Sequence, residues 1–121
     1  MRVLIAGSRT FDNFDLLTQK MTKILSNSDP QTLEIVSGGA RGADTLGEKY
    51  AQEKKFSLKI FPANWEKHGK SAGYRRNEKM ADYVTHAVIF WDGKSRGTSH
   101  MINLCKKRKI PLRVIRYSNY S

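Results

Sequence analysis

Short apolar runs alternate with amphipathic stripes along almost the whole chain. Five runs have the length of a buried strand and end in glycine, proline or polar residues: 2–6, 33–36, 58–61, 87–91 and 111–115. Continuous apolar runs of this kind are typical of strands that are covered on both faces. The pattern therefore predicts a parallel sheet.

Between the runs, apolar residues recur every three or four positions, which is the spacing of a helix with one buried face. These stripes predict helices at residues 14–25, 43–51, 74–83 and 98–107. Asp12 or Asn13 supplies the N-cap of the first helix. The polar segment 63–73 shows no period, so we expect a long loop there.

Strands that alternate with helices need crossover connections, which place helices on both faces of the sheet. We predict an α/β fold: one small Rossmann-like domain at residues 1–116, with a parallel five-stranded sheet. We expect the tail 117–121 to be frayed. The apolar runs are too short to cross a membrane, and the segment at the N-terminus does not have the length of a secretory signal, so we expect a cytoplasmic protein.

Two glycine-bearing turns follow predicted strands and precede predicted helices. The first is Ser37-Gly38-Gly39-Ala40-Arg41-Gly42-Ala43-Asp44, and the second is Gly93-Lys94-Ser95-Arg96-Gly97-Thr98. Glycine lets the backbone approach a ligand closely, and the start of a helix offers unpaired N–H groups. Both turns therefore indicate a binding site for an anion such as phosphate.

All strand-to-helix turns of a parallel sheet lie on one edge, so these turns should meet the turn after the first strand. Arginine guanidinium groups and small residues at that edge suit phosphate oxygens. The candidate ligand-binding residues are Gly7, Ser8, Arg9, Gly38, Gly39, Arg41, Gly42, Asp44, Arg75, Arg76, Asn77, Trp91, Lys94, Ser95, Arg96, Gly97 and Thr98.

Some of these residues have a simpler structural explanation. Asp44 would bind a ribose hydroxyl or stabilise the start of its helix, and Trp65 or Trp91 would stack on a base or pack in the core. We favour Trp91 for the site, because it ends a strand beside a glycine turn. Cys105 reads as a buried structural thiol.

Familiar motifs for cofactors and metals are missing. If Gly93 were the second glycine of a Walker A loop, the first glycine would be needed at position 88, where the chain has Val88. The first half of the dinucleotide-binding fingerprint is also absent. The histidines and the cysteine lack the spacing of metal ligands. We expect no cofactor and no metal, and no catalytic residue can be assigned.

The charge balance points to anionic partners. The chain has 22 Lys and Arg against 11 Asp and Glu, a formal net charge of +11. Such a field attracts nucleotides, and it would also suit nucleic acid at a basic surface.

The motifs together resemble the YspA/YpsA-related branch of the SLOG superfamily. The resemblance spans residues 2–115. It rests on Ala6-Gly7-Ser8-Arg9, the 37–44 turn, Phe61-Pro62-Ala63-Asn64-Trp65 with Lys67-His68-Gly69, Ala72-Gly73-Tyr74-Arg75-Arg76-Asn77 with Met80, and Gly93 to Thr98. It implies a fold similar to the LOG phosphoribohydrolases and to the DNA-processing protein DprA. It also implies a nucleotide-derived ligand.

One departure from the LOG enzymes bears on catalysis. Their second glycine motif carries a glutamate that helps to cleave the N-glycosidic bond, and Met101 stands at that position in this chain. A catalytic arginine that lacks this glutamate as its acid partner suits ligand binding better than hydrolysis. His100 would be an alternative acid or base.

Three functions follow as hypotheses. The first is binding of a phosphorylated nucleotide derivative, such as a nucleotide, an ADP-ribose-like molecule or a cyclic signal, by a homo-oligomer. The second is a nucleosidase or phosphoribohydrolase that acts on a nucleoside monophosphate, with Asp44, Asp92 or His100 as proton donor. The third is DprA-like binding of nucleic acid.

Overall fold

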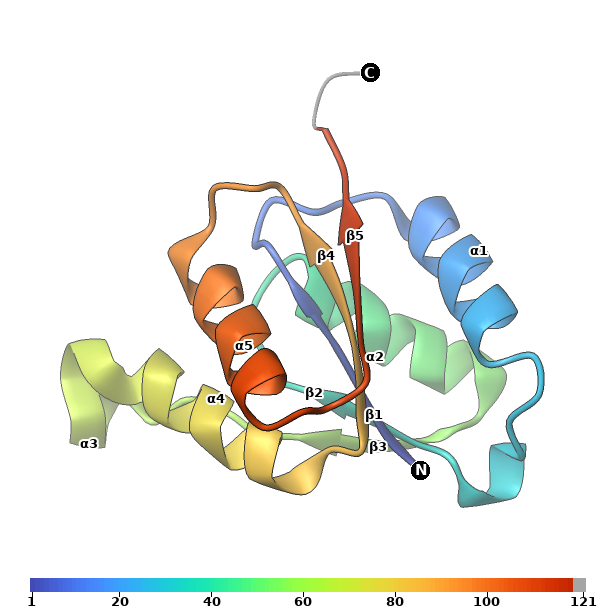
Figure 1. The fold of residues 1–121 in the computed structure, drawn as a ribbon, viewed down its shortest axis with the longest axis horizontal. Coiled ribbons are helices and arrows are strands. Elements are labelled where there is room, and N and C mark those ends of the chain that lie inside the picture. The colour runs from blue at the N-terminus through green and yellow to red at the C-terminus, as the bar shows by residue number, and fades with distance from the viewer. Residues whose placement is uncertain (119–121) are drawn as a thin grey trace.

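The computed structural model describes residues 1–118, and its strands form one five-stranded sheet in the order β3-β2-β1-β4-β5 (Figure 1). The strands are β1 (Arg2–Gly7), β2 (Glu34–Ser37), β3 (Ser57–Ile60), β4 (His86–Trp91) and β5 (Leu112–Arg116). Every neighbouring pair runs parallel. The predicted α/β class with a Rossmann-like sheet is confirmed.

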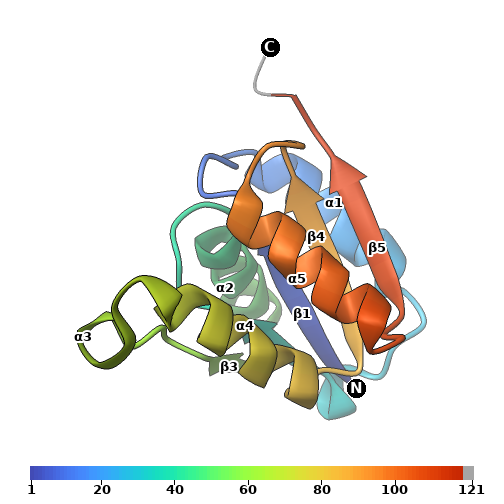
Figure 2. The same ribbon diagram turned by 60° about the vertical axis from the view of Figure 1, so that its left-hand side comes forward.

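Helices cover both faces of the sheet. The helices are α1 (Phe14–Ile24), α2 (Ala43–Lys54), α3 (Trp65–His68), α4 (Ala72–Tyr83) and α5 (Arg96–Lys107), with short 3₁₀ turns η1 (Pro30–Thr32) and η2 (Gly69–Ser71). In Figure 1, α1 and α2 lie on one side of the strands and α4 and α5 on the other. Figure 2 shows α4 and α5 side by side over the sheet.

The alternation of side chains along β1 divides the core into two layers. Val3 and Ile5 pack with α1 and α2, whereas Leu4 and Ala6 pack with α4 and α5. Both layers are closed by apolar stripes of the helices, because burial of these stripes removes apolar surface from water. Cys105 belongs to the second layer as a free, buried thiol, and burial raises its pKa to about 11.

The expected long loop at 63–73 is wrong. This segment contains α3 and η2, and α4 begins at Ala72. Asn64 caps α3 by accepting a hydrogen bond from the Lys67 amide at 3.1 Å, and Gly69 ends it at a positive φ of 55°. A helix of four residues is too short to show a hydrophobic period, so only these capping residues could have indicated it.

Tyr117, the first residue of the expected frayed tail, has contacts within the fold. Arg116 is the last residue of β5, the Tyr117 amide donates to the Trp91 carbonyl at 3.2 Å, and the Tyr117 ring packs edge-on against Phe11. Residues 119–121 lie outside the described residues. Within residues 1–118, no helix has the length and hydrophobicity that a membrane span requires.

We predict that Gly7→Ala destabilises the fold. Gly7 pairs with Phe90, and a Cβ at position 7 would overlap the Phe90 carbonyl oxygen and lie 2.8 Å from the Ala43 Cβ. Overpacking of this kind costs about 1–3 kcal/mol in unfolding free energy, which urea denaturation would measure. Gly97→Ala is the control, since a Cβ there meets nothing within 4 Å. Equal stability of the two variants would contradict this close packing of β1 against β4 and α2.

Candidate functional site

The site lies where the order of the strands reverses. From β1 the chain passes to β2 and β3 on one side of the sheet, and then to β4 and β5 on the other. The carboxyl ends of β1 and β4 therefore flank a crevice at the switch point, which is the place where open α/β sheets bind ligands.

A cavity of about 260 Å³ opens at this crevice, between β1, the β2–α2 loop, α4 and α5. The predicted site residues that line it are Gly7, Arg9, Asp44, Arg76, Asn77, Ser95, Gly97 and Thr98. The topology thus brings together residues from four separate parts of the chain, as the sequence predicts.

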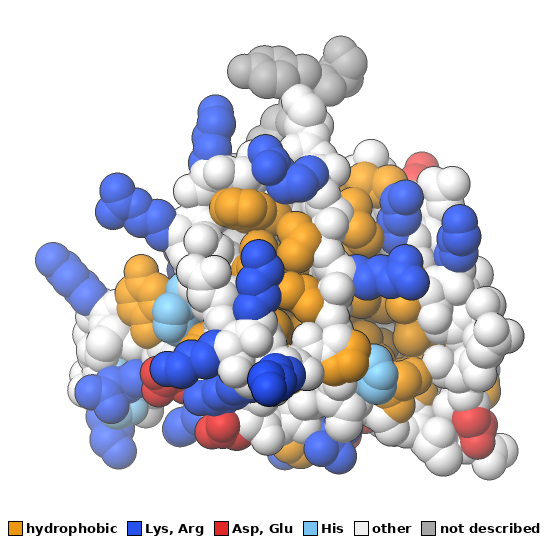
Figure 3. All heavy atoms as spheres, in the orientation of Figure 1, with side chains coloured by type: hydrophobic (Ala, Val, Ile, Leu, Met, Phe, Trp, Pro, Cys, Tyr) orange, Lys and Arg blue, Asp and Glu red, His pale blue; other side chains and the backbone are white. Residues whose placement is uncertain are grey.

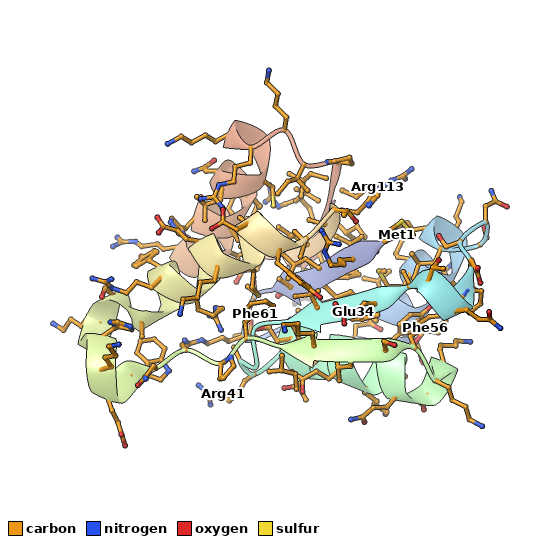
Figure 4. The ribbon with its side chains drawn as sticks, turned by 90° about the horizontal axis from the view of Figure 1, so that it is seen from below. Met1, Glu34, Arg41, Phe56, Phe61 and Arg113 are labelled. Atoms are coloured by element: carbon orange, nitrogen blue, oxygen red, sulfur yellow. The ribbon has the colours of Figure 1, made fainter. Side chains whose placement is uncertain are left out.

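A second hollow adjoins the cavity and shares Arg9, Ala40, Trp65 and Arg76 with it. It has a volume of about 320 Å³, and Gly38, Gly39 and Arg41 complete the predicted residues in its lining. We call it the arginine hollow, because Arg9, Arg41 and Arg76 surround it. Figure 4 shows Arg41 near the end of β3.

Six predicted residues line neither space, and three of them have structural contacts. Ser8 is buried, and its hydroxyl accepts a hydrogen bond from the Asp92 amide at 3.1 Å. Gly42 has a φ of 78°, and a Cβ there would lie 2.6 Å from the Arg9 carbonyl carbon. The Trp91 indole donates to the Ser95 carbonyl at 3.1 Å, and Arg116 covers its ring.

The other three are basic side chains on the surface. Lys94 and Arg96 are exposed, and Arg75 donates to the Ser71 hydroxyl at 3.0 Å. A nucleotide contact by any of the predicted site residues, whether or not it lines one of the two spaces, stays a prediction.

Gly38 permits the closest contact in the site. The Arg76 guanidinium reaches from α4 to the β2–α2 loop and donates a hydrogen bond to the Gly38 carbonyl. A Cβ at position 38 would lie 2.7 Å from Arg76 Nη1 and 2.8 Å from Asp44 Oδ2. A side chain at position 38 would therefore require the ends of the Arg76 and Asp44 side chains to shift.

Two amides of the central turn donate within the protein. The Gly39 amide donates to the Ser37 hydroxyl at 3.2 Å, and the Ala40 amide donates to Asp44 Oδ2 at 3.1 Å. The turn therefore offers an anion fewer backbone donors than its glycines suggest. The guanidinium groups around the arginine hollow are the stronger donors for an anion.

Asn77 connects α4 to α5. Its amide nitrogen lies 3.3 Å from the Gly97 carbonyl and 3.2 Å from His100 Nδ1, and its amide oxygen accepts from Arg76 Nε at 3.0 Å. The side chain is buried. Asn77 therefore holds Arg76 in position and has little capacity left for a ribose hydroxyl.

Asp44 carries the most perturbed carboxyl at the cavity. It is 5 % exposed, and burial raises its pKa to about 6, against the lowering effects of the Ala40 amide and the Arg76 charge. Burial likewise lowers the pKa of Arg76. A carboxyl with a pKa near neutrality can donate or accept a proton under physiological conditions.

The two other candidate proton donors lie outside the cavity lining. The Asp92 carboxylate accepts from the amides of Lys94 and Ser95, and these bonds outweigh the effect of burial and lower its pKa. His100 is bonded to Asn77, and burial lowers its pKa. Among the described residues, Asp44 is therefore the carboxyl group that lines the cavity. Met101, at the position of the LOG glutamate, also lines it.

Several residues that line the cavity are not among those predicted from the sequence. Trp65 and Tyr74 line it with exposed fractions of 52 % and 45 %, and Lys70 and Gly73 lie beside them. An aromatic residue in an otherwise polar segment was the available signal for Trp65. The preference for Trp91 over Trp65 receives no support from the lining of either space.

We predict that Asp44→Asn changes how stability depends on pH. Because the folded pKa of about 6 exceeds the ordinary 3.8, stability from Asp44 is fully present below 3.8 and is lost as the pH rises through about 6. The loss amounts to at most about 3 kcal/mol at neutral pH. Asparagine is neutral at every pH. The free energy of unfolding of the variant, relative to that of the wild type, should therefore increase between about pH 4 and pH 7.

Urea denaturation across this range would measure the change, with Asp12→Asn at an exposed position as control. A difference between Asp44→Asn and the wild type that does not vary with pH would contradict the raised pKa.

Comparisons with known proteins agree with the fold and the motifs. The model of the "YspA, cpYpsA-related SLOG family" matches residues 1–68. The "Gene 61 protein" of Mycobacterium phage D29 is 34 % identical over 117 residues, which cover 92 % of this chain and 93 % of the phage protein.

A solved structure shares the fold. DNA processing protein A from Helicobacter pylori, described with a single-stranded DNA binding mode, matches with a TM-score of 0.73 and 20 % identity. The match covers 100 % of this chain and 67 % of that one. The resemblance drawn from the motifs is confirmed: the chain belongs to the YspA, cpYpsA-related SLOG family.

Proposed function

We propose that this protein binds a phosphorylated nucleoside derivative at the switch point of its sheet. The phosphate lies in the arginine hollow, and the sugar and base lie in the adjoining cavity. A nucleotide, an ADP-ribose-like molecule and a cyclic nucleotide share this chemistry.

The observation that carries the proposal is the grouping of Arg9, Arg41 and Arg76 around one hollow. Over the described residues its lining contains no carboxylate, so nothing in that lining offsets the three positive charges. Guanidinium groups bind phosphate oxygens through paired, charge-assisted hydrogen bonds. Arg76 is already oriented by Asn77 and Gly38, which reduces the entropy lost on binding.

The neighbouring cavity suits the rest of a nucleotide. Trp65 and Tyr74 present exposed rings on which a base can stack, and the Asp44 carboxyl can accept a hydrogen bond from a sugar hydroxyl. Asp44 is absent from the lining of the arginine hollow, although its carboxyl lies close to Arg76 beside Gly38.

The comparisons support a ligand of this class in general terms. Membership of a SLOG family and the fold shared with DNA processing protein A favour a nucleotide or a nucleic acid. They do not choose the ligand, and the proposal of a small molecule rests on the grouped arginines beside a cavity with exposed aromatic rings.

We predict that Arg41→Ala weakens nucleotide binding at least tenfold, which corresponds to about 1.4 kcal/mol. Titration calorimetry with AMP, ATP, ADP-ribose and a cyclic dinucleotide would measure the affinities. Arg113→Ala is the matched control, because Arg113 is an exposed arginine of β5 that Figure 4 shows far from Arg41. If both variants bind every nucleotide as the wild type does, the arginine hollow is not the phosphate site.

The raised pKa of Asp44 favours a second candidate function, hydrolysis of a nucleoside monophosphate. Water would add to the sugar carbon as the bond to the base breaks. The Asp44 carboxyl would give its proton to the departing base, and the carboxylate would take back the proton that the added water loses. The products would be the free base and ribose 5-phosphate. Met101 at the position of the LOG glutamate speaks against this activity.

Chromatography of AMP, GMP and CMP incubated with the protein distinguishes the two functions. A hydrolase would release free base, and Asp44→Asn would reduce the rate by about 100-fold or more while still binding the nucleotide. A binding protein would return the nucleotides unchanged.

A further inference from the structure

A third hollow lies outside the nucleotide site, between the end of β3, α3 and α4. Its volume is about 420 Å³. Arg76 lines it at the boundary with the arginine hollow, and its other Lys and Arg residues are Lys59, Lys67, Arg75 and Lys79, around a floor that includes Phe61. We call it the basic groove. Figure 4 shows Phe61 at the end of β3, on the side of the molecule that carries α3 and α4.

The four cations come from three different elements and converge on one space. Lys59 belongs to β3, Lys67 to α3, and Arg75 and Lys79 lie one helical turn apart on α4. The pKa of His68 is lowered, first by burial and then by the charges of three basic groups on α3 and α4. These groups are Arg75, Lys67 and Lys79. Their positive potentials therefore add within the groove.

These charges are not neutralised inside the described part of the protein. Over residues 1–118, the one ion pair joins Arg108 to Asp82, and no basic residue of the groove takes part in it. The groove lining contains no carboxylate among the described residues, although Glu66 lies on α3. Lys and Arg also cover much more of the face in Figure 3 than Asp and Glu do.

Apolar surface accompanies the charges. Ile60 lines the groove and is 44 % exposed, and Phe61 and Pro62 continue the apolar floor. Lys59 lies over the rings of Phe61 and Tyr83, at 5.5 Å and 5.3 Å from their centroids. A groove that combines cations with exposed apolar surface can hold both the phosphates and the unstacked bases of a single strand.

We propose that the basic groove binds single-stranded nucleic acid through its sugar-phosphate backbone. A duplex keeps its bases stacked inside and would leave the apolar floor unused, and a flat anionic membrane would reach only the rim. The groove is separate from the proposed nucleotide site, since Lys67 and Lys79 line neither the cavity nor the arginine hollow. Pro62 and Arg76 line the boundary between the two regions.

The test compares two double variants with the same change of charge. Lys67→Glu with Lys79→Glu alters the groove, whereas Lys20→Glu with Lys23→Glu alters exposed positions on α1, which covers the opposite face of the sheet. Fluorescence anisotropy with a labelled oligothymidylate of about 20 nucleotides would give affinities over about 50–200 mM salt.

The groove variant should lose at least tenfold in affinity, and its plot of log affinity against log salt should become shallower by about 1.4, the contribution of two phosphates. The α1 variant should keep both values close to those of the wild type. Circular dichroism melting curves identify a variant that loses affinity by unfolding, and in that case single substitutions at Lys67 and Lys79 are measured instead.

Three results would overturn the proposal: equal losses in the two double variants, tighter binding of a duplex of the same length, or tighter binding of vesicles that contain phosphatidylserine. Nucleotide binding in the cavity is measured on the same variants and should not change. The two measurements therefore test the two proposals separately: oligonucleotide binding tests the basic groove, and nucleotide binding tests the nucleotide site.

Discussion

The architecture of the site depends on the contact between the Arg76 guanidinium and the backbone at Gly38. Arg76 belongs to α4 and Gly38 follows β2, so this contact joins a helix on one face of the sheet to the central turn. The absence of a side chain at position 38 leaves room for the guanidinium, and Asn77 holds Arg76 from the other side. Arg76 lines both the cavity and the arginine hollow, so this contact fixes part of the wall that they share.

Burial of charge is the cost of this arrangement. Asp44 and Arg76 both lie where desolvation disfavours their charged forms, and their mutual attraction offsets the penalty only in part. A fold selected for stability alone would place apolar or neutral residues there. Perturbed groups that face a cavity are typical of sites that act on a ligand.

The distribution of positive charge separates the surface into two regions. Arginines surround the hollow beside the cavity, whereas lysines dominate the groove between β3, α3 and α4. The planar guanidinium fork suits a fixed phosphate, and the flexible ammonium group suits a backbone that varies along its length. If both proposed sites are occupied as we infer, the basic residues behind the net charge of +11 bind two kinds of ligand, a nucleotide and a single-stranded nucleic acid.

The sequence alone was sufficient for the fold, because buried strands such as β1 and β4 are continuous apolar runs and each is followed by an amphipathic helix. It also located the edge where Gly7, Asp44 and Gly97 meet, since strand topology determines that edge. It could not find α3, which is shorter than a hydrophobic period.

The sequence pattern also could not predict which residues each side chain contacts in the folded protein. The sequence context favoured Trp91 over Trp65 as a ligand contact, yet the indole of Trp91 bonds to Ser95 and Trp65 is half-exposed at the cavity. Asn77 is predicted as a ligand contact, and no sequence pattern indicated its hydrogen-bond contacts with Gly97 and His100. Such assignments depend on tertiary contacts between residues that are distant along the chain.

The most direct test of a nucleotide site at the switch point is mass spectrometry of small molecules released when the purified protein is denatured. We expect a phosphorylated nucleoside derivative from the wild type, and much less of it from Gly97→Ala. A Cβ at position 97 would enter open space in the cavity lining without disturbing the fold. Equal recovery of the same compound from both proteins, or recovery of a compound without phosphate, would contradict a nucleotide site at the switch point.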